Sequence, residues 1–389
     1  MPCFGHAAAM DFSLTEDQRA VLETVDRFCA RHLPIQEVRR RDRAHLPPYD
    51  LLPLMGEAGF FRLALPEAWG GIGADWQTVS LVQERLAWHG YSAGSIFNRV
   101  VGFGIASLLG YGNEAQKSEM LPRLAEGRLL LALALTEPQA GTDAGAITTR
   151  AAKVDGGWRI TGRKTWISDA GGADLLLVAA RSEPGSAGAA GISMLLVPPK
   201  APGIAMTKLE KVGNNCMPSW DIGFDDAFVS DDALMGEEGK GFRHLMSTLA
   251  ASRASLAATT TGCAQRAVDI AVAHARERVQ FGRPIGANQA IRHTLANMQM
   301  RVDQSRLIVR HLAWLIATGQ SCRREAAQAK IIATECLQYV THHGMQILAS
   351  AGYHADSDMQ RFWRDARLFT FGEGTSEVMR DLVAREMGL

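Results

Sequence analysis

One carboxylate near the end of the chain has the neighbours of a catalytic base. Gly372 and Gly374 flank Glu373, and the phenylalanines Phe369 and Phe371 precede it. Glycine lets a ligand approach the backbone closely, and apolar surroundings make a carboxylate a better proton acceptor. We therefore expect Glu373 to be displayed in apolar surroundings as a general base, although a plain surface turn before a last helix would show the same pattern.

Two further segments have the residue types of a ligand-binding site. The segment 134–145 combines two hydroxyls, two carboxylates and glycines, and such donors can hold a polar heterocycle or a phosphate. A strand over 164–168 would place Trp166 and Ser168 on one face, so that an indole plane and a hydroxyl meet one flat ligand. A structural turn and a core tryptophan are the alternatives for these two segments.

A third segment ends a long predicted helix. Arg278 and Phe281 stand three residues apart there, so that the guanidinium could bind a phosphate and the ring could stack on a base. Arginine is also favoured at a helix C-terminus because its charge suits the helix dipole. The pattern alone leaves both explanations open.

Several other kinds of site are missing from the sequence. It contains no glycine-rich dinucleotide or phosphate loop, no His-Glu-x-x-His pair and no Gly-x-Ser-x-Gly elbow. The adjacent His342 and His343 cannot face one ligand together on a helix. The six cysteines are scattered and form no Cys-x-x-Cys pair, which fits a reducing cytoplasm. A metal centre and catalysis by a nucleophilic serine are therefore not expected.

The composition is that of a globular protein with balanced charge. Of 389 residues, 47% are hydrophobic, and 41 basic residues balance 41 acidic ones, so no general attraction to nucleic acid or anionic membranes is expected. The chain lacks the run of about 18 apolar residues that a membrane span needs, and residues 1–9 do not read as a secretory signal. We expect these nine residues to be a disordered extension or a misassigned start.

The spacing of apolar residues predicts the elements that must position these candidates. Helices are expected over 13–33, with a capping box at Thr15 and Gln18, and over 51–58, 78–89, 95–109 and 114–126. Short β-type runs are expected over 147–154, 158–161, 175–180, 192–197 and 220–224. Long helices are expected over 242–280, 290–317 and 324–348.

These patterns predict an α+β multidomain fold in three parts. An N-terminal α-helical domain covers 10–128, a middle antiparallel β domain covers 129–236, and a C-terminal four-helix bundle covers 237–389. Strands that follow one another without long helices argue against a nucleotide-binding α/β sheet.

Together these segments resemble the acyl-CoA dehydrogenase family, flavoenzymes that introduce a double bond next to a thioester. The similarity runs from about Met10 to Leu389. Its most specific parts are Thr-Glu-Pro-x-Ala-Gly-Thr-Asp, starting at Thr136, and Glu-Gly-Thr-Ser-Glu, starting at Glu373. The resemblance implies FAD as cofactor, conversion of an acyl-CoA to the trans-2-enoyl-CoA in fatty acid metabolism, and an electron-transfer flavoprotein as acceptor. A flavin oxidase or monooxygenase and a non-catalytic DNA-associated relative remain as alternatives.

The resemblance also implies contacts with FAD. Leu135 and Thr136 would contact the flavin ring, Trp166 would pack on it, and Ser168 would hydrogen-bond near its reactive N5. Further cofactor-binding candidates are Thr142 and Ser350, the pair Thr375 and Glu377 for adenosine in the same subunit, and Arg278, Phe281, Gln289 and Gln346 for the FAD of a neighbouring subunit. A homodimer would then be the smallest complete unit, and relatives are commonly homotetramers.

For catalysis, Glu373 matches the family's base, which takes the α-proton while the β-hydride goes to flavin N5. Some relatives carry the base at the position of Ser252, and serine cannot do that work. Arg253 resembles an arginine that supports the base and the CoA side of the pocket, and Thr142 and Gly374 are further substrate-binding candidates.

Departures from the family pattern leave the acyl group open. Ala250 stands where many relatives have an acidic CoA contact, and Gly372 replaces a frequent tyrosine. Arg99, in the helix that usually floors the acyl pocket, could pair with a polar or carboxylated acyl chain. A helix arginine more commonly reaches solvent or a neighbour.

Overall fold

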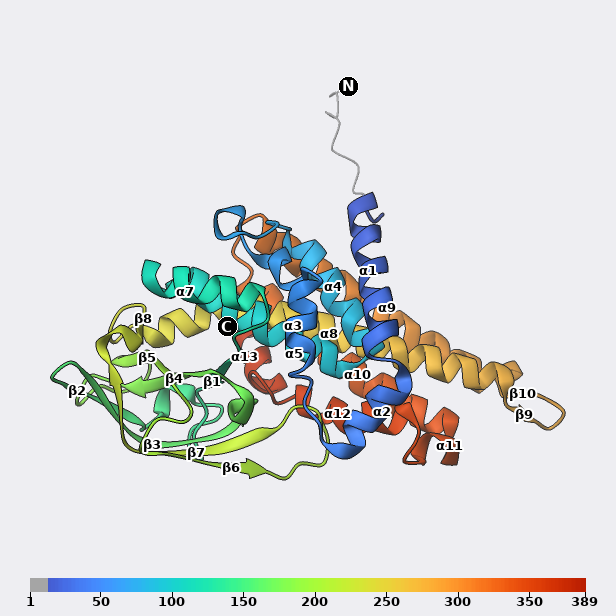
Figure 1. The fold of residues 1–389 in the computed structure, drawn as a ribbon. Helices are drawn as coiled ribbons and strands as arrows, with labels where there is room; N and C mark the ends of the chain where they lie inside the picture. The colour runs from blue at the N-terminus through green and yellow to red at the C-terminus, as the bar shows by residue number, and fades with distance from the viewer. Residues whose placement is uncertain (1–12) are drawn as a thin grey trace, which may run out of the picture.

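A computed structural model describes residues 13–389. N-terminal helices, a β domain and C-terminal helices follow one another along the chain (Figure 1). The β domain lies at one end of the molecule, and the long C-terminal helices extend away from it into an arm at the other end (Figure 1). The predicted fold class is confirmed. The expectation for residues 1–9 lies outside the described residues.

The N-terminal part is helical, as predicted. Its helices are α1 Glu16–His32, α2 Ile35–Ala44, α3 Leu51–Glu57, α4 Trp76–His89, α5 Tyr91–Asn98, α6 Ala106–Tyr111 and α7 Glu114–Ala125. The expected capping box begins α1, because the Gln18 amide donates to the Thr15 hydroxyl and the Thr15 amide donates to the Gln18 side chain. Val25, Phe28 and Cys29 form its buried face.

One apolar helix forms the core of this part. A π-helical segment, Arg99–Ile105, joins α5 to α6, so that Tyr91–Tyr111 is one helix. Among the residues that the structure describes, this helix alone has the length and composition of a membrane span, yet 72% of its apolar window is buried inside the protein. It is therefore a core helix, and its π-helical turn is of a kind found often at functional sites.

The β domain is a single mixed sheet. Its strands are β1 Leu131–Ala134, β2 Arg150–Val154, β3 Gly157–Ser168, β4 Leu175–Arg181, β5 Ile192–Val197, β6 Ile204–Leu209, β7 Ser219–Ser230 and β8 Leu234–Met235. The strand order is β6-β7-β3-β2-β4-β5-β8, with β1 beside β4.

Most strand pairs are antiparallel as predicted, and two are not. Leu131 of β1 lies opposite Leu175 in a parallel pair, and β2 meets β4 in parallel at Arg150 and Arg181. Sequence order alone could not show this. A parallel pair needs a crossover connection, and for β1 and β4 that connection contains the strands β2 and β3 in place of a helix.

The C-terminal part is built on three long helices. Its elements are α8 Gly241–Glu277, the hairpin strands β9 Val279–Gln280 and β10 Arg283–Pro284, α9 Gln289–Ala317, α10 Arg323–Leu348, α11 Ser350–Tyr353, α12 Asp358–Phe369 and α13 Ser376–Glu386. Helix α8 packs against α4, α9 and α10, and residues 252–264 in its middle are all buried. Small residues permit this close packing: a Cβ at Gly262 would lie 2.1 Å from the carbonyl oxygen of Glu84 in α4.

Ion pairs fix the last part of the chain to the first. Arg39 of α2 contacts Asp358 at 2.9 Å, and Arg364 of α12 contacts Asp42 at 2.7 Å. Both pairs anchor the helix that leads into the turn carrying Glu373, so the turn starts from a fixed position.

Candidate active site

Glu373 lies on a strained turn between α12 and α13. Its backbone φ is +56°, in the left-handed region that non-glycine residues rarely adopt. Gly374 follows at φ +100°, and a Cβ there would lie 2.8 Å from Cε of Met379, so the position requires glycine. Thr375 then caps α13 by accepting from the Val378 amide at 3.3 Å. Strain of this kind persists where the surroundings enforce it, and it is typical of functional sites.

Side chains from α8 and α10 hold this turn. Ser252 Oγ donates to Glu373 Oε2 at 2.8 Å. Lys330, which is completely buried, donates from Nζ to the carbonyl oxygens of Thr370 at 3.2 Å and Gly374 at 2.6 Å. Arg253 is buried beside the same turn, and its Nε has no hydrogen-bond partner among the residues that the structure describes. The serine at the alternative base position therefore orients the carboxylate of Glu373.

Buried cations surround this carboxylate. Burial lowers the pKa of Lys330 to about 8, although attraction to Glu373 opposes the shift. Burial likewise lowers the pKa of Arg253, again against the attraction of Glu373. The expectation of apolar surroundings is therefore wrong, because the pattern of nearby phenylalanines gave no signal for cations on distant helices, and Phe371 itself is half-exposed.

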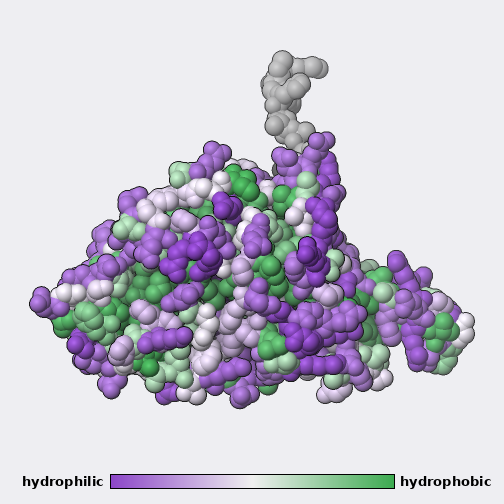
Figure 2. Space-filling model, in the orientation of Figure 1, coloured by the Kyte–Doolittle hydropathy of each residue, from purple (hydrophilic) through white to green (hydrophobic). Residues whose placement is uncertain are grey.

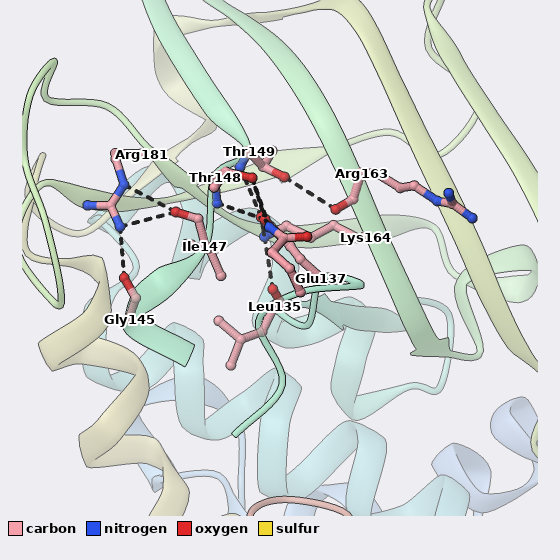
Figure 3. Close-up of polar contacts among 10 residues, drawn as sticks. Leu135, Glu137, Gly145, Ile147, Thr148, Thr149, Arg163, Lys164 and Arg181 are labelled. Atoms are coloured by element: carbon pink, nitrogen blue, oxygen red, sulfur yellow. Dashed lines mark hydrogen bonds and ion pairs between the residues drawn. The ribbon is translucent and has the colours of Figure 1, made fainter. Parts of the chain in front are cut away.

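Glu137 anchors the segment that follows β1 (Figure 3). Its carboxylate is buried and accepts five hydrogen bonds between 2.7 and 3.0 Å, from Gln139 Nε2, the amide and hydroxyl of Thr148, the Thr149 amide and Lys164 Nζ. Lys164 also donates to the carbonyl oxygen of Leu135 at 2.9 Å. Sequence reasoning treated Glu137 only as part of a ligand-binding loop, whereas it is the buried partner of a strand lysine.

The charge of Glu137 is stabilised in this position. Burial opposes the ionisation of Glu137. The positive charge of Lys164 and the hydrogen bonds from Lys164, Thr148 and Thr149 outweigh burial and lower the pKa of Glu137 to about 2. For Lys164, burial outweighs the same attraction, and its pKa is lowered as well. Glu137, with five donors, is the partner whose charged form the site favours.

Trp166 is turned outward next to this anchor. The register between β3 and β7 shifts between Lys164 and Ile167, and Trp166 lies in the shifted stretch with φ +59° and 54% of its surface exposed. The alternative of a core tryptophan is therefore wrong. The Thr165 amide donates to the carbonyl oxygen of Thr136 at 2.9 Å, so the segment after β1 lies beside the end of β3. Thr136 is thus brought close to Trp166, with Leu135 and Ser168 as their near neighbours along the chain.

A buried ion pair lies directly after Ser168. Asp169 accepts from Arg99 Nε at 3.1 Å and from the Tyr49 hydroxyl at 3.0 Å. The Arg99 side chain is only 16% exposed, so it does not reach solvent as a helix arginine commonly does. Sequence reasoning missed Asp169, because one aspartate after a strand carries no sign of a partner from a helix far upstream.

Two of the remaining cofactor candidates lie at the other end of the molecule. At 1.5 Å per residue, α8 is about 37 Å long between Ser252 and Glu277. Arg278 and Phe281 therefore lie in the arm far from Glu373 (Figure 1), and the Phe281 ring is fully exposed. The other exposed candidates are Thr142, Gln289, Gln346, Ser350 and Glu377.

Comparison with known proteins identifies the class to which this fold and site belong. Residues 15–128, 132–227 and 239–388 match the family models for the N-terminal, middle and C-terminal domains of acyl-CoA dehydrogenases. The chain therefore belongs to the acyl-CoA dehydrogenase family. It is an oxidoreductase, and its cofactor is FAD, as in the rest of this family.

Individual relatives match over nearly the whole chain. The probable acyl-CoA dehydrogenase YngJ of Bacillus subtilis is 35% identical over 97% of this chain and 100% of its own. Benzylmalonyl-CoA dehydrogenase of Aromatoleum aromaticum is also 35% identical, over 97% of this chain and 100% of its own. The solved butyryl-CoA dehydrogenase of Megasphaera elsdenii has 31% identity and a TM-score of 0.93, covering 98% of this chain and 100% of its own.

The residues near β3 fit a flavin ring. An indole held outward by a left-handed backbone offers a flat apolar face that the protein itself does not cover. The Ser168 hydroxyl ends the same strand, and the Glu137–Lys164 pair fixes the backbone of Leu135 and Thr136 next to it. The arrangement provides stacking and hydrogen bonding to one planar heterocycle.

Proposed function

We propose that this protein dehydrogenates an acyl-CoA thioester between Cα and Cβ to give the trans-2-enoyl-CoA, with Glu373 as the base. The observation that carries the proposal is the strained turn of Glu373, held by Ser252 and Lys330, with Arg253 buried beside it. A carboxylate fixed in this way can accept a proton from a substrate held against it. The hydrogen bond from Ser252 fixes the direction of its oxygens.

In this proposal, Glu373 takes the α-proton of the acyl group. Its backbone amide and the left-handed Gly374 leave room for the thioester oxygen, which gains negative charge as the proton departs and is stabilised by such donors. Arg253 and Thr142 would contact the CoA side of the substrate. Bound FAD supplies the acceptor for the β-hydride.

We assign the flavin ring to Leu135, Thr136, Trp166 and Ser168, with Thr142 as a further contact. Thr375 and Glu377 would contact the adenosine part in the same subunit. The residues of the arm and its surroundings, Arg278, Phe281, Gln289, Gln346 and Ser350, would contact the FAD of a neighbouring subunit. Their distance from Glu373 along α8 supports this division.

A homo-oligomer follows from this assignment. Met300, Leu307 and Trp314 are each more than 40% exposed, at 54%, 53% and 43%, and their seven-residue spacing places them on one face of α9. Apolar residues are also visible among the polar ones on the arm (Figure 2). A homodimer is the smallest complete unit, and covering the α9 face as well would give a homotetramer.

The remaining parts of the proposal rest on the family and the composition. We propose the domain limits 10–128, 129–236 and 237–389, an electron-transfer flavoprotein as electron acceptor, and a role in fatty acid metabolism in the cytoplasm. The five cysteines within residues 13–389 are free, in keeping with a reducing compartment. Zero net charge supports the dehydrogenase over a DNA-associated protein.

The decisive experiment is an anaerobic titration of the purified yellow protein with short, medium, branched and aromatic acyl-CoAs. Flavin absorbance should bleach with some of them, while Glu373→Gln should keep its FAD and fail to bleach. Normal bleaching by that variant would sink the assignment of the base. Fast oxygen consumption without an electron-transfer protein would indicate an oxidase or monooxygenase instead, and adding enoyl-CoA to the reduced protein tests the reverse direction.

A further inference from the structure

The Arg99 guanidinium is mostly buried and keeps an unused hydrogen-bond donor. It donates from Nε to Asp169, and from Nη2 at 2.9 Å to the thioether sulfur of Met217, which is a weak acceptor. Within residues 13–389, Nη1 has no hydrogen-bond partner, and it is not completely enclosed. A mostly buried arginine with an accessible N–H group can hold an oxygen of a bound molecule.

One face of this guanidinium is covered by an aromatic ring. Its Cζ lies 5.6 Å from the ring centre of Phe103. Tyr91 and Ser95 both donate to the Met217 sulfur, at 3.3 and 3.5 Å, and this fixes the sulfur against the guanidinium. An oxygen that approaches in the plane of the guanidinium would meet Nη1 and the outer side of Nη2.

Arg99 borders the same region as the proposed base. Burial opposes the charge of Arg99, but attraction to Asp169 and, more weakly, to Glu373 raises its pKa. The Tyr91 ring packs against Phe369, 5.2 Å between centres, at the end of the helix that leads into the Glu373 turn. On the other side, Asp169 follows Ser168, which is assigned to the flavin. Arg99 therefore lies between the flavin side and the base side, and it opens the π-helical turn Arg99–Ile105.

We propose that Arg99 binds the far end of the substrate's acyl chain, and that this chain carries an oxygen acceptor, as a carboxylate, hydroxyl or carbonyl group, instead of ending in plain alkyl. The proposal rests on the proposed acyl-CoA dehydrogenation at the same site. Arg99 is already paired with the Asp169 carboxylate. The requirement is therefore for an acceptor oxygen, and a second negative charge is not needed.

The test compares acyl-CoAs of equal chain length. In the Glu373→Gln protein with FAD bound, which binds without turnover, calorimetry measures the Kd of pentanoyl-CoA, glutaryl-CoA and 5-hydroxypentanoyl-CoA, and of the corresponding four- and six-carbon sets. We expect an oxygen-bearing member of at least one set to bind about tenfold more tightly than its alkyl partner. Comparing the Kd of the carboxylate member with that of the hydroxyl member shows which of the two oxygen-bearing groups Arg99 binds.

Variants then assign the preference to Arg99. Loss of Arg99 alone would leave Asp169 buried and unpaired, so the test variant is Arg99→Leu with Asp169→Asn, which removes both charges. The preference should disappear in this variant and survive in the matched control, Arg85→Leu with Asp26→Asn, an ion pair between α4 and α1. Equal or tighter binding of the alkyl member in every set, or an unchanged preference in the test variant, overturns the proposal. If no acyl-CoA bleaches the flavin of the unaltered protein, the proposed function itself fails, which is a distinct result.

Discussion

Lys330 offers the sharpest test of how the proposed base is held. Replacing it with Met keeps the length of a buried side chain but removes the ammonium that donates to the carbonyl oxygens of Thr370 and Gly374. Lys330 itself is not a proposed contact with FAD or substrate. If Lys330 keeps the Glu373 turn in place, activity should fall while the fold persists.

The expected effect on stability is small because two contributions oppose each other. Burial lowers the pKa of Lys330 from 10.5 to about 8, and at about 1.4 kcal/mol per pKa unit its charge costs the folded state about 3 kcal/mol. This cost is fully present below about pH 8, the pKa of Lys330 in the folded protein. It fades between about pH 8 and 10.5, because in this range Lys330 binds its proton in the unfolded chain but not in the folded protein. Methionine removes the cost, but it leaves two carbonyl groups unpaired at about 1 to 3 kcal/mol each.

The expected effect on catalysis is large. Loss of a charged donor from the Glu373 turn is worth about 1.5 to 3 kcal/mol, so flavin reduction should slow by about tenfold to a hundredfold.

The assay is stopped-flow reduction of the flavin under anaerobic conditions across pH, with FAD content and urea unfolding measured on the same preparations. Lys330→Gln keeps a donor without the charge and separates the two roles. Lys117→Met, at a lysine on α7 that pairs with Glu114 near the surface, is the control. An unchanged rate, combined with a loss of several kcal/mol in stability, would refute the reasoning, since Lys330 would then be structural only.

Three further predictions concern the rest of the site. Glu137→Gln leaves Lys164 buried without its partner and should lower the free energy of unfolding by about 3 to 5 kcal/mol, as measured in urea. In the unaltered protein, the contribution of Glu137 is present above its unfolded pKa of 4.5 and is lost as pH falls toward about 2, which acid titration of that variant and the parent checks. Ser252→Ala should bind FAD normally but reduce it about tenfold more slowly, and an unchanged rate would show that the hydrogen bond to Glu373 has no role. Phe281→Ala should release FAD and shift the oligomer toward smaller species in light scattering, whereas the same substitution at Phe371, also exposed, should not change the oligomer.

The spacing of apolar residues along the sequence predicted most of the fold. The capping box at Thr15 and Gln18 and the long helix up to Glu277 follow from local pattern, and both were predicted. The parallel pair of β1 and β4 was not, because strand direction depends on how distant segments meet. The short strand β6 was missed as well: it shows little alternation, since its residues are mostly half-buried or exposed.

The residues of the candidate site also fall into those that the sequence predicted and those that it did not. Residues within a specific local motif, such as Thr136, Trp166 and Glu373, could be selected from the sequence. Their supports could not, because Glu137 finds Lys164 on another strand, and Glu373 finds Lys330 on a helix that shows only ordinary helical spacing. Local sequence therefore indicated where chemistry takes place, but tertiary packing decides which charges surround it.

The charge of Glu373 also balances two buried cations. Arg253 and Lys330 are both buried, and attraction to Glu373 opposes the effect of burial on the pKa of each of them. Glu373→Gln removes this charge with the same shape and should unfold about 1 to 3 kcal/mol more easily than the parent in urea at neutral pH. Adding Lys330→Met should restore part of this loss, because one of the two uncompensated cations is then gone. Equal or greater stability of the single variant would mean that Glu373 does not balance these cations, and the argument that they belong to the site of the base would fall.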